Sequence, residues 1–126
     1  MITAIVDSHR EIRVAVSVLA SDGTECSVDA ILDTGFNDSL TLPLSLIAEL
    51  GLPWKLRETA VLANGQSEEV DVYGATILWD GEEKDILVLG LEAESLLGME
   101  MLLGFDLRAR IEVGGRVEIE RNIVEV

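Results

Sequence analysis

The sequence predicts a small all-β domain with one or two short helices. Three observations support this prediction: apolar residues that recur with a period of two, Asp-Gly and Asn-Gly dipeptides between the apolar runs, and a length of 126 residues. Alternating apolar residues are typical of strands with one buried face, and both dipeptides favour hairpin turns. Hydrophobic residues make up 48% of the chain, which is enough for one core and indicates a single domain over residues 1–126.

The N-terminal part of the chain is expected to form a hairpin that ends in a carboxylate. Residues 1–6 are apolar, but Asp7 ends this run, which is too short for a signal peptide or a membrane span. A strand is expected over residues 12–19, where apolar side chains alternate with others. Asp22-Gly23 then turns the chain into a second strand that ends at Asp33.

The middle of the chain combines short helices with further hairpins. Residues 43–50 carry apolar side chains at helical spacing and are followed by Gly51, which predicts a helix with a glycine cap. A hairpin over residues 58–73 is expected to turn at Asn64-Gly65, and another at Asp80-Gly81. A second short helix is expected after Gly98.

The C-terminal pattern predicts one more hairpin. Its loop would be Gly114-Gly115-Arg116, with Val113 opposite Val117 and Ile111 opposite Ile119. This register places all four apolar side chains on one face, which a strand with one buried side requires.

The charge of the chain limits its partners. Nine Lys and Arg oppose 24 Asp and Glu, which gives a formal net charge of −15. Nucleic acids and anionic membrane surfaces would repel such a chain, so neither is expected as a partner. The acidic residues are interpreted mainly as a solvated face, with selection of basic or apolar substrates as the alternative.

The charge is unevenly distributed along the chain. Residues 108–126 contain four arginines and four glutamates, so that this segment is neutral and the whole net charge lies in residues 1–107. A neutral segment is able to pack against its own copy without strong repulsion.

Two motifs carry the candidate chemistry. Asp33-Thr34-Gly35 follows the apolar run 28–32 and precedes Phe36 and the Leu-Thr-Leu-Pro of residues 40–43. A carboxylate that a buried strand delivers into a tight turn is suited to general acid/base catalysis. Near the C-terminal end, residues 95–107 contain an apolar-apolar-Gly segment, Leu96-Leu97-Gly98, that runs into the second expected helix.

In this order, and about sixty residues apart, the two motifs resemble the signatures of retropepsin-like (clan AA) aspartic proteases. The resemblance covers roughly residues 11–113 and is strongest to stand-alone bacterial and archaeal single-lobe members. It implies a single-lobe acid protease barrel. Pepsin-type chains carry two Asp-Thr/Ser-Gly copies, whereas this chain has one, so the resemblance implies half an active site per chain and a homodimer.

The resemblance also implies roles for individual residues. Asp33 from each of two subunits would share one proton and activate the water that attacks a peptide bond, with no cofactor and no metal. Thr34 would hold the two loops together, and Gly35 would let the backbone approach the substrate. The residues expected to contact a peptide substrate follow in the same loop and at the tip of a flap hairpin: Phe36, Asn37, Asp38, Ala63, Asn64 and Gly65.

The sequence departs from the family pattern at two places. Phe36 stands where viral and pepsin-like members often carry Ala or Ser, and it cannot donate a hydroxyl hydrogen bond to Asp33. Met99-Glu100 stands where viral enzymes carry Arg-Asn, so the dimer must be held by other contacts. The main alternative is therefore a catalytically inactive protease-like β domain that serves protein binding or dimerisation, and a generic structural β domain comes third.

Cysteine and histidine offer no competing chemistry. Cys26 is the only cysteine, which excludes an intrachain disulfide and favours a reducing compartment, so a cytoplasmic location is expected. With His9 as the only histidine, neither a Cys-His nucleophile nor a His/Cys metal site is supported. Cys26 is expected to be a buried or half-buried strand residue.

Overall fold

The structure, a computed structural model, describes residues 1–61 and 63–122. Residues 123–126, the end of the neutral segment 108–126, lie outside the described residues. The described residues form mainly β-strands, with one α-helix and one 3-10 helix: β1 (Ile2–Val6), β2 (Ile12–Leu19), β3 (Glu25–Leu32), β4 (Leu40–Leu42), α1 (Leu44–Leu50), β5 (Trp54–Val61), β6 (Ser67–Trp79), β7 (Glu82–Gly90), β8 (Leu96–Leu97), η1 (Met99–Leu102), β9 (Phe105–Ala109) and β10 (Arg116–Arg121).

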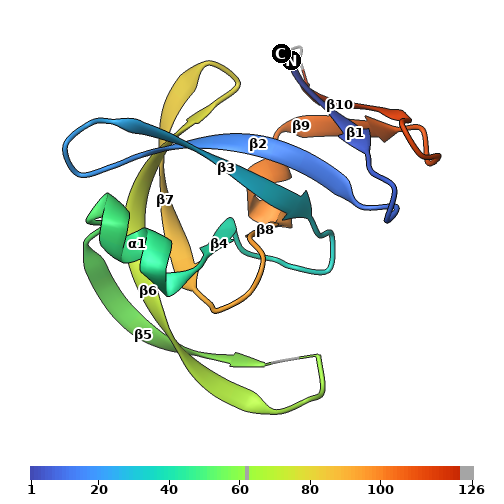
Figure 1. The fold of residues 1–126 in the computed structure, drawn as a ribbon. Helices are drawn as coiled ribbons and strands as arrows, with labels where there is room; N and C mark the ends of the chain where they lie inside the picture. Colours follow the sequence, from blue (N-terminus) through green and yellow to red (C-terminus); the bar gives the residue numbers. More distant parts are fainter. Residues whose placement is uncertain (62, 123–126) are drawn as a thin grey trace.

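The strands form one sheet that folds back on itself. Their order is β5-β6-β7-β4-β8-β3-β2-β1-β10-β9, and β2 pairs in addition with β6, for example Val18 opposite Ile77. This extra pairing closes a barrel around the core (Figure 1). The buried side chains of β2 are Val14, Val16 and Val18, so the period of two is confirmed and the all-β prediction with it.

Most of the predicted turns and helix ends are confirmed. Asp80 and Gly81 form a two-residue turn between β6 and β7, and both residues have positive φ, 52° and 80°. A two-residue hairpin loop in a type I′ turn requires positive φ at both positions. Gly51 ends α1 in the left-handed conformation. The expected helix after Gly98 is present as the 3-10 turn η1. The apolar run 1–6 contains β1, which pairs with β10.

The predicted register of the C-terminal hairpin is wrong. In the structure, Val117 lies opposite Ala109 and Ile119 opposite Leu107, so the loop comprises residues 110–115. Ile111 and Val113, expected in the strand, are 71% and 64% exposed. The observed register differs from the predicted one by four residues. An even shift keeps every side chain on its face, so the apolar pattern fits both registers equally well.

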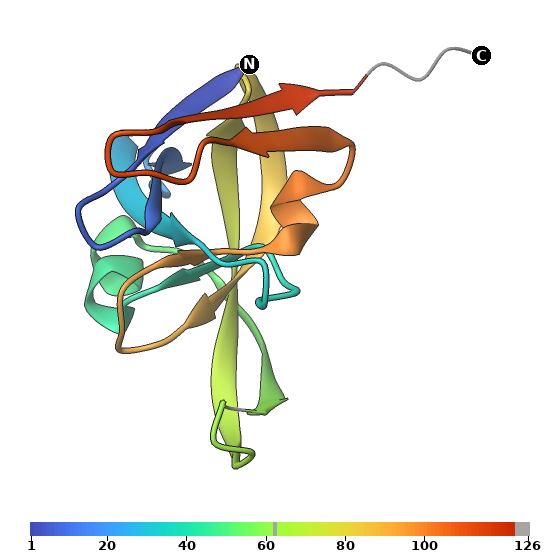
Figure 2. The same ribbon diagram turned by 90° about the vertical axis from the view of Figure 1, so that its right-hand side faces the viewer.

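The β5–β6 hairpin projects from the barrel as a long ribbon (Figure 2). Every residue of β5 except Ala60 is exposed, and the hairpin is longer than the predicted 58–73. No helix in residues 1–61 and 63–122 is long and apolar enough to cross a membrane.

Candidate active site

Asp33 lies at the carboxyl end of β3, where a second strand fixes the backbone. Its amide donates a hydrogen bond to the carbonyl oxygen of Leu97 over 2.9 Å, and the amide of Ile31 donates to Ser95 over 2.8 Å. These bonds belong to the parallel pairing of β3 with β8. The two motifs found in the sequence therefore lie side by side, and Asp33 is half-buried at their junction.

The Asp33 loop, residues 33–36, is closed by its own hydrogen bonds. The amide of Gly35 donates to Oδ1 of Asp33 over 2.9 Å, and the amide of Phe36 donates to the Asp33 carbonyl over 3.1 Å. Within the described part of the chain, no other hydrogen bond reaches the Asp33 carboxylate. Oδ2 is left for water, a substrate or a second carboxylate, while the exposed Thr34 and Gly35 form the tip of the loop.

Gly98 allows the two motifs to pack closely. A Cβ at this position would overlap the carbonyl oxygen of Asp38 and would lie 2.6 Å from Cδ2 and 2.7 Å from the carbonyl oxygen of Phe36. The amide of Gly98 donates to Ser39 over 2.9 Å, and that of Met99 donates to Phe36 over 2.8 Å. Any larger residue at position 98 would separate η1 from the Asp33 loop.

Thr41 is a positioning residue that sequence reasoning missed. It is 1% exposed in β4, and its Oγ1 accepts a hydrogen bond from the amide of Leu96 over 2.8 Å. This bond helps to hold β8 beside β3, because a buried hydroxyl and a buried amide satisfy each other. The sequence feature that could have indicated this role is the position of Thr41 between two leucines in a short apolar run, where its hydroxyl would be buried.

Phe36, predicted to contact substrate, is half-buried and packs against an apolar cluster at the root of the β5–β6 hairpin. The buried members of this cluster are Val70, Val72 and Leu89. The side chain thus connects the Asp33 loop to the strands that carry the hairpin. Its neighbours Asn37 and Asp38 are exposed.

The predicted flap residues Ala63, Asn64 and Gly65 are exposed at the tip of the β5–β6 hairpin. Gly65 has φ +82°, and the amide of Gln66 donates to Oδ1 of Asn64 over 2.9 Å. The hairpin tip and the Asp33 loop lie on the same side of the molecule, at the right of Figure 1 and toward the viewer in Figure 2. The structure therefore brings both groups of predicted site residues to one face.

The base of the hairpin is fixed by an aromatic and charged contact. Asp71 accepts hydrogen bonds from Nε1 of Trp54 over 3.0 Å and from Nε of Arg57 over 3.1 Å. The Trp54 indole, and after it the Arg57 guanidinium, hold the pKa of the Asp71 carboxyl below its usual value. This contact links β5 to β6 at the base of the hairpin, and the tip lies outside it.

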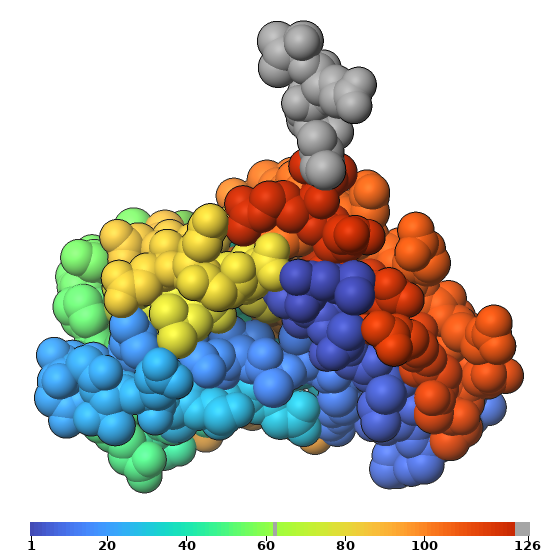
Figure 3. Space-filling model, turned by 90° about the horizontal axis from the view of Figure 1, so that it is seen from above, coloured from blue at the N-terminus to red at the C-terminus, as the bar shows by residue number. Residues whose placement is uncertain are grey.

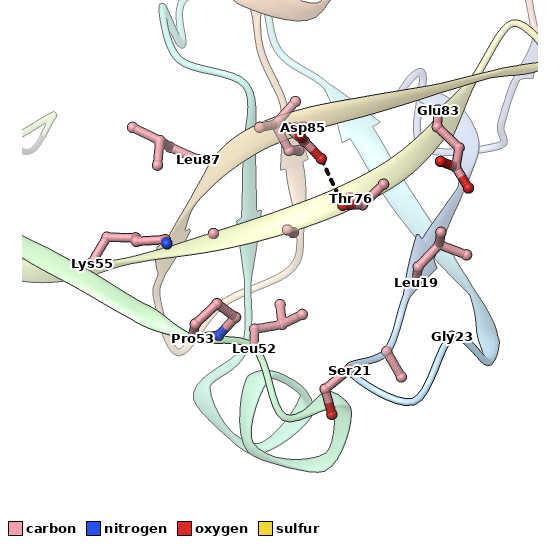
Figure 4. Close-up of a pocket in the computed structure, with 14 residues that line it drawn as sticks. Leu19, Ser21, Gly23, Leu52, Pro53, Lys55, Thr76, Glu83, Asp85 and Leu87 are labelled. Carbon is pink, nitrogen blue, oxygen red and sulfur yellow. Dashed lines mark hydrogen bonds between the residues drawn. The ribbon is translucent and has the colours of Figure 1, made fainter.

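Two cavities lie near the hairpin strands. One, of about 260 Å³, reaches Asp38, which follows the Asp33 loop by two residues. Its acidic lining residues are Asp38, Glu58, Asp85 and Glu100, and its one basic residue is Lys84. The other, of about 640 Å³, is lined by the start of β5, the β2–β3 turn and the strands β6 and β7 (Figure 4). None of the site residues predicted from the sequence lines the larger cavity.

One cluster has donor atoms of the kind that metals bind. Asp7, His9 and Glu11 place their ligand atoms within 4.8 Å of one another in the β1–β2 turn. Both oxygens of Asp7 are already engaged, because Oδ1 accepts the amides of His9 and Glu11 and Oδ2 accepts Nε of Arg13. The cluster is thus explained as the hydrogen-bonded turn between β1 and β2.

Comparison with known proteins supports the architecture. No family model matches the sequence, and no curated protein matches it. Among solved structures, a retropepsin-like aspartic protease from Rickettsia conorii is similar with a TM-score of 0.57 and 18% identity, over 92% of this chain and 87% of that chain. EIAV protease in complex with the inhibitor HBY-793 gives a TM-score of 0.49 and 21% identity, over 72% and 86%. The chain thus has the predicted single-lobe, retropepsin-like fold.

Proposed function

We propose that this retropepsin-like chain is an aspartic endopeptidase that is active as a homodimer. One observation carries the proposal: the half-buried Asp33, fixed by Leu97 and Gly35, leaves one carboxylate oxygen without a partner in the described part of the chain. A rigid carboxylate with a free oxygen at a turn is suited to proton transfer. Because the sequence supplies one such group, the paired carboxylates of this chemistry need a second copy.

In the proposed mechanism, the two Asp33 side chains face each other across a two-fold axis and share one proton, since two adjacent ionised carboxylates repel. The ionised carboxylate takes a proton from a water molecule, whose oxygen attacks the carbonyl carbon of the scissile peptide bond. The protonated carboxyl group donates to the carbonyl oxygen as negative charge develops there. Proton transfer to the nitrogen then lets the amine leave, and the other product is a carboxylic acid. No cofactor or metal takes part.

The substrate is proposed to be an extended peptide or protein segment between the Asp33 loop and the hairpin tip. Phe36, Asn37 and Asp38 would contact it from one side, and Ala63, Asn64 and Gly65 from the other. The acidic lining of the 260 Å³ cavity beside Asp38 supports a preference for basic side chains near the scissile bond. Thr34 is proposed to hold the Asp33 loops of the two subunits together. The enzyme is proposed to be cytoplasmic.

Cleavage of an unfolded protein by the purified chain tests this function. We expect the wild-type chain to cut a reduced, denatured protein and the Asp33→Asn variant to leave that protein intact. The far-UV circular dichroism spectrum of the variant should equal that of the wild-type chain, which shows that the variant is folded. Asp29→Asn is the matched control, because Asp29 lies on the same strand and is exposed. Equal cleavage by wild type and Asp33→Asn would contradict the proposal. Peptide binding without cleavage by either would favour an inactive binding module.

A further inference from the structure

The loop 110–115 between β9 and β10 presents two large apolar side chains to solvent. Ile111 is 71% and Val113 64% exposed. The loop backbone is nevertheless fixed, because the amide of Glu112 donates to Arg110 over 3.0 Å and that of Gly115 donates to Glu112 over 2.7 Å. Apolar side chains held outward by a rigid backbone are typical of interface anchors, since little conformational entropy is lost when they bind.

The same loop is fastened to the N-terminal strand. The amide of Gly114 donates to the carbonyl of Val6 over 2.8 Å, and the amide of Val6 donates to Gly115 over 3.0 Å. Ile5, 57% exposed, lies on the neighbouring position of β1, opposite Arg116. Figure 3 shows the N-terminal and C-terminal strands side by side as one continuous surface. The loop that carries the exposed apolar residues is therefore held by backbone hydrogen bonds to a second chain segment.

Ile111 is flanked by two residues of opposite charge, Arg110 and Glu112. In the part of the chain that the structure describes, neither of them forms an ion pair. The other arginines of this segment are paired, Arg108 and Arg116 with Glu118, and Arg121 with Asp80 and Glu82. Arg110 and Glu112 are both exposed and thus available to charges on another molecule.

The charge distribution favours a second copy of this chain as the molecule that would cover the loop. Elsewhere the chain carries its whole net charge of −15, whereas residues 108–126 are neutral, so two copies repel each other least at this segment. In an isologous contact, residue i meets residue j of the partner and residue j meets residue i. Arg110 would then meet the partner's Glu112, and Glu112 the partner's Arg110, on either side of the apolar residues.

We propose that loop 110–115 is a self-association surface, with Ile111 and Val113 at its centre and two reciprocal Arg110–Glu112 ion pairs at its edge. The inference rests on the proposed homodimer and specifies which contacts hold it. The loop lies on the same side of the molecule as the Asp33 loop, at some distance from it (Figures 1 and 2). The proposal requires one two-fold axis on that side that serves both contacts. The loop would also supply dimer contacts that Met99-Glu100 does not, because these two residues stand where viral enzymes carry Arg-Asn.

Charge reversal tests the reciprocal pairing by sedimentation velocity and native mass spectrometry. Arg110→Glu alone, or Glu112→Arg alone, places like charges opposite each other twice, and each is expected to weaken the homodimer by about tenfold or more. An equimolar mixture of the two variants is expected to form heterodimers in preference to either homodimer, and the double variant is expected to recover the wild-type affinity. Lys55→Glu and Glu83→Arg are the controls, because they change the charge equally at residues that line the cavity of 640 Å³.

A second pair of variants tests the apolar centre. Val113→Ser is expected to weaken the dimer, whereas Val61→Ser, which removes a similarly exposed valine from β5, is not. A wild-type chain that stays monomeric overturns the inference and the proposed homodimer together. A dimer in which the charge-reversed variants show no preference for each other overturns only the surface. Preferred pairing together with an Asp33→Asn chain that still cleaves would uphold the surface and reject the proposed chemistry.

Discussion

The amide of Asp33 donates a hydrogen bond to the carbonyl oxygen of Leu97 over 2.9 Å, which joins the two sequence motifs at the junction of β3 and β8. The candidate catalytic carboxylate is thus positioned by a strand of only two residues, Leu96–Leu97. The geometry of the site consequently depends on the segment after Leu97, where Gly98 packs against the backbone of the Asp33 loop and Asp38.

Gly98→Ala is expected to destabilise the chain by about 3 kcal/mol, because the added methyl group would meet backbone atoms that have no room to move. Gly98 has φ −104°, so the cost would arise from crowding alone. Gly104→Ala is the matched control. That glycine has φ +83° with no atom within 4 Å of a Cβ, and the expected cost is about 1 kcal/mol of backbone strain. Urea denaturation of both variants checks the order, and equal costs would contradict the close packing at Gly98.

Activity in mixed dimers is expected to fall as the square of the wild-type fraction. A dimer of one wild-type chain and one Asp33→Asn chain lacks the proton-sharing pair and should be nearly inactive. The measurement is the cleavage rate after full subunit exchange between wild type and Asp33→Asn, at fixed total protein and saturating dimerisation. A linear fall would mean that each chain carries a complete site.

Gly65→Val is expected to lower turnover with little loss of stability. A β-branched residue is poorly tolerated at φ +82°, and the strain would fall on the hairpin tip, which is exposed. Gly23→Val is the control, since Gly23 has φ +87°, also has no atom within 4 Å of a Cβ, and lies in the β2–β3 turn. Steady-state cleavage kinetics of both variants give the comparison. Unchanged kinetics for Gly65→Val would remove this glycine from substrate binding.

Asp7 is expected to make stability depend on pH in the acidic range. The Glu11 amide contributes most to a lowered pKa of the Asp7 carboxyl, and the Arg13 side chain and the His9 amide add to it. Because the pKa is lowered in the folded state, the stabilisation is present at neutral pH. It is lost progressively as the pH falls from about 4, the usual pKa of Asp, through the lower pKa of the carboxyl in the folded state. Asp7→Asn keeps an acceptor oxygen but removes the charge, so its stability should be lower than wild type at pH 7 and should approach wild type near pH 3.

Denaturation of wild type and Asp7→Asn at both pH values is the measurement. Glu68→Gln serves as its control, because it removes one charge from an exposed position of β6 that forms no ion pair in the described residues. A stability difference between wild type and Asp7→Asn that does not change with pH would exclude the carboxylate as its source.

The sequence by itself determined the elements that local chemistry specifies. The alternation in β2, the turn at Asp80-Gly81 and the end of α1 at Gly51 each depend on a few neighbouring residues, and the structure confirms them. The position of Asp33-Thr34-Gly35 at the end of a strand was also predictable, because a strand followed by a turn depends on neighbouring residues only. The alternation and the turn dipeptides also predicted an all-β fold, which the structure confirms.

Only the tertiary structure decided which distant strands meet. The C-terminal hairpin shows why, since both its registers satisfy the same apolar alternation. The observed register also lets Val6 exchange hydrogen bonds with Gly114 and Gly115. The same holds for Thr41 and Phe36. Their partners, Leu96 and the cluster around Val72, lie far away in the sequence and become neighbours only when the barrel closes. Local preferences cannot specify such pairs, because the free energy that selects them comes from burying distant apolar surfaces and satisfying backbone hydrogen bonds together.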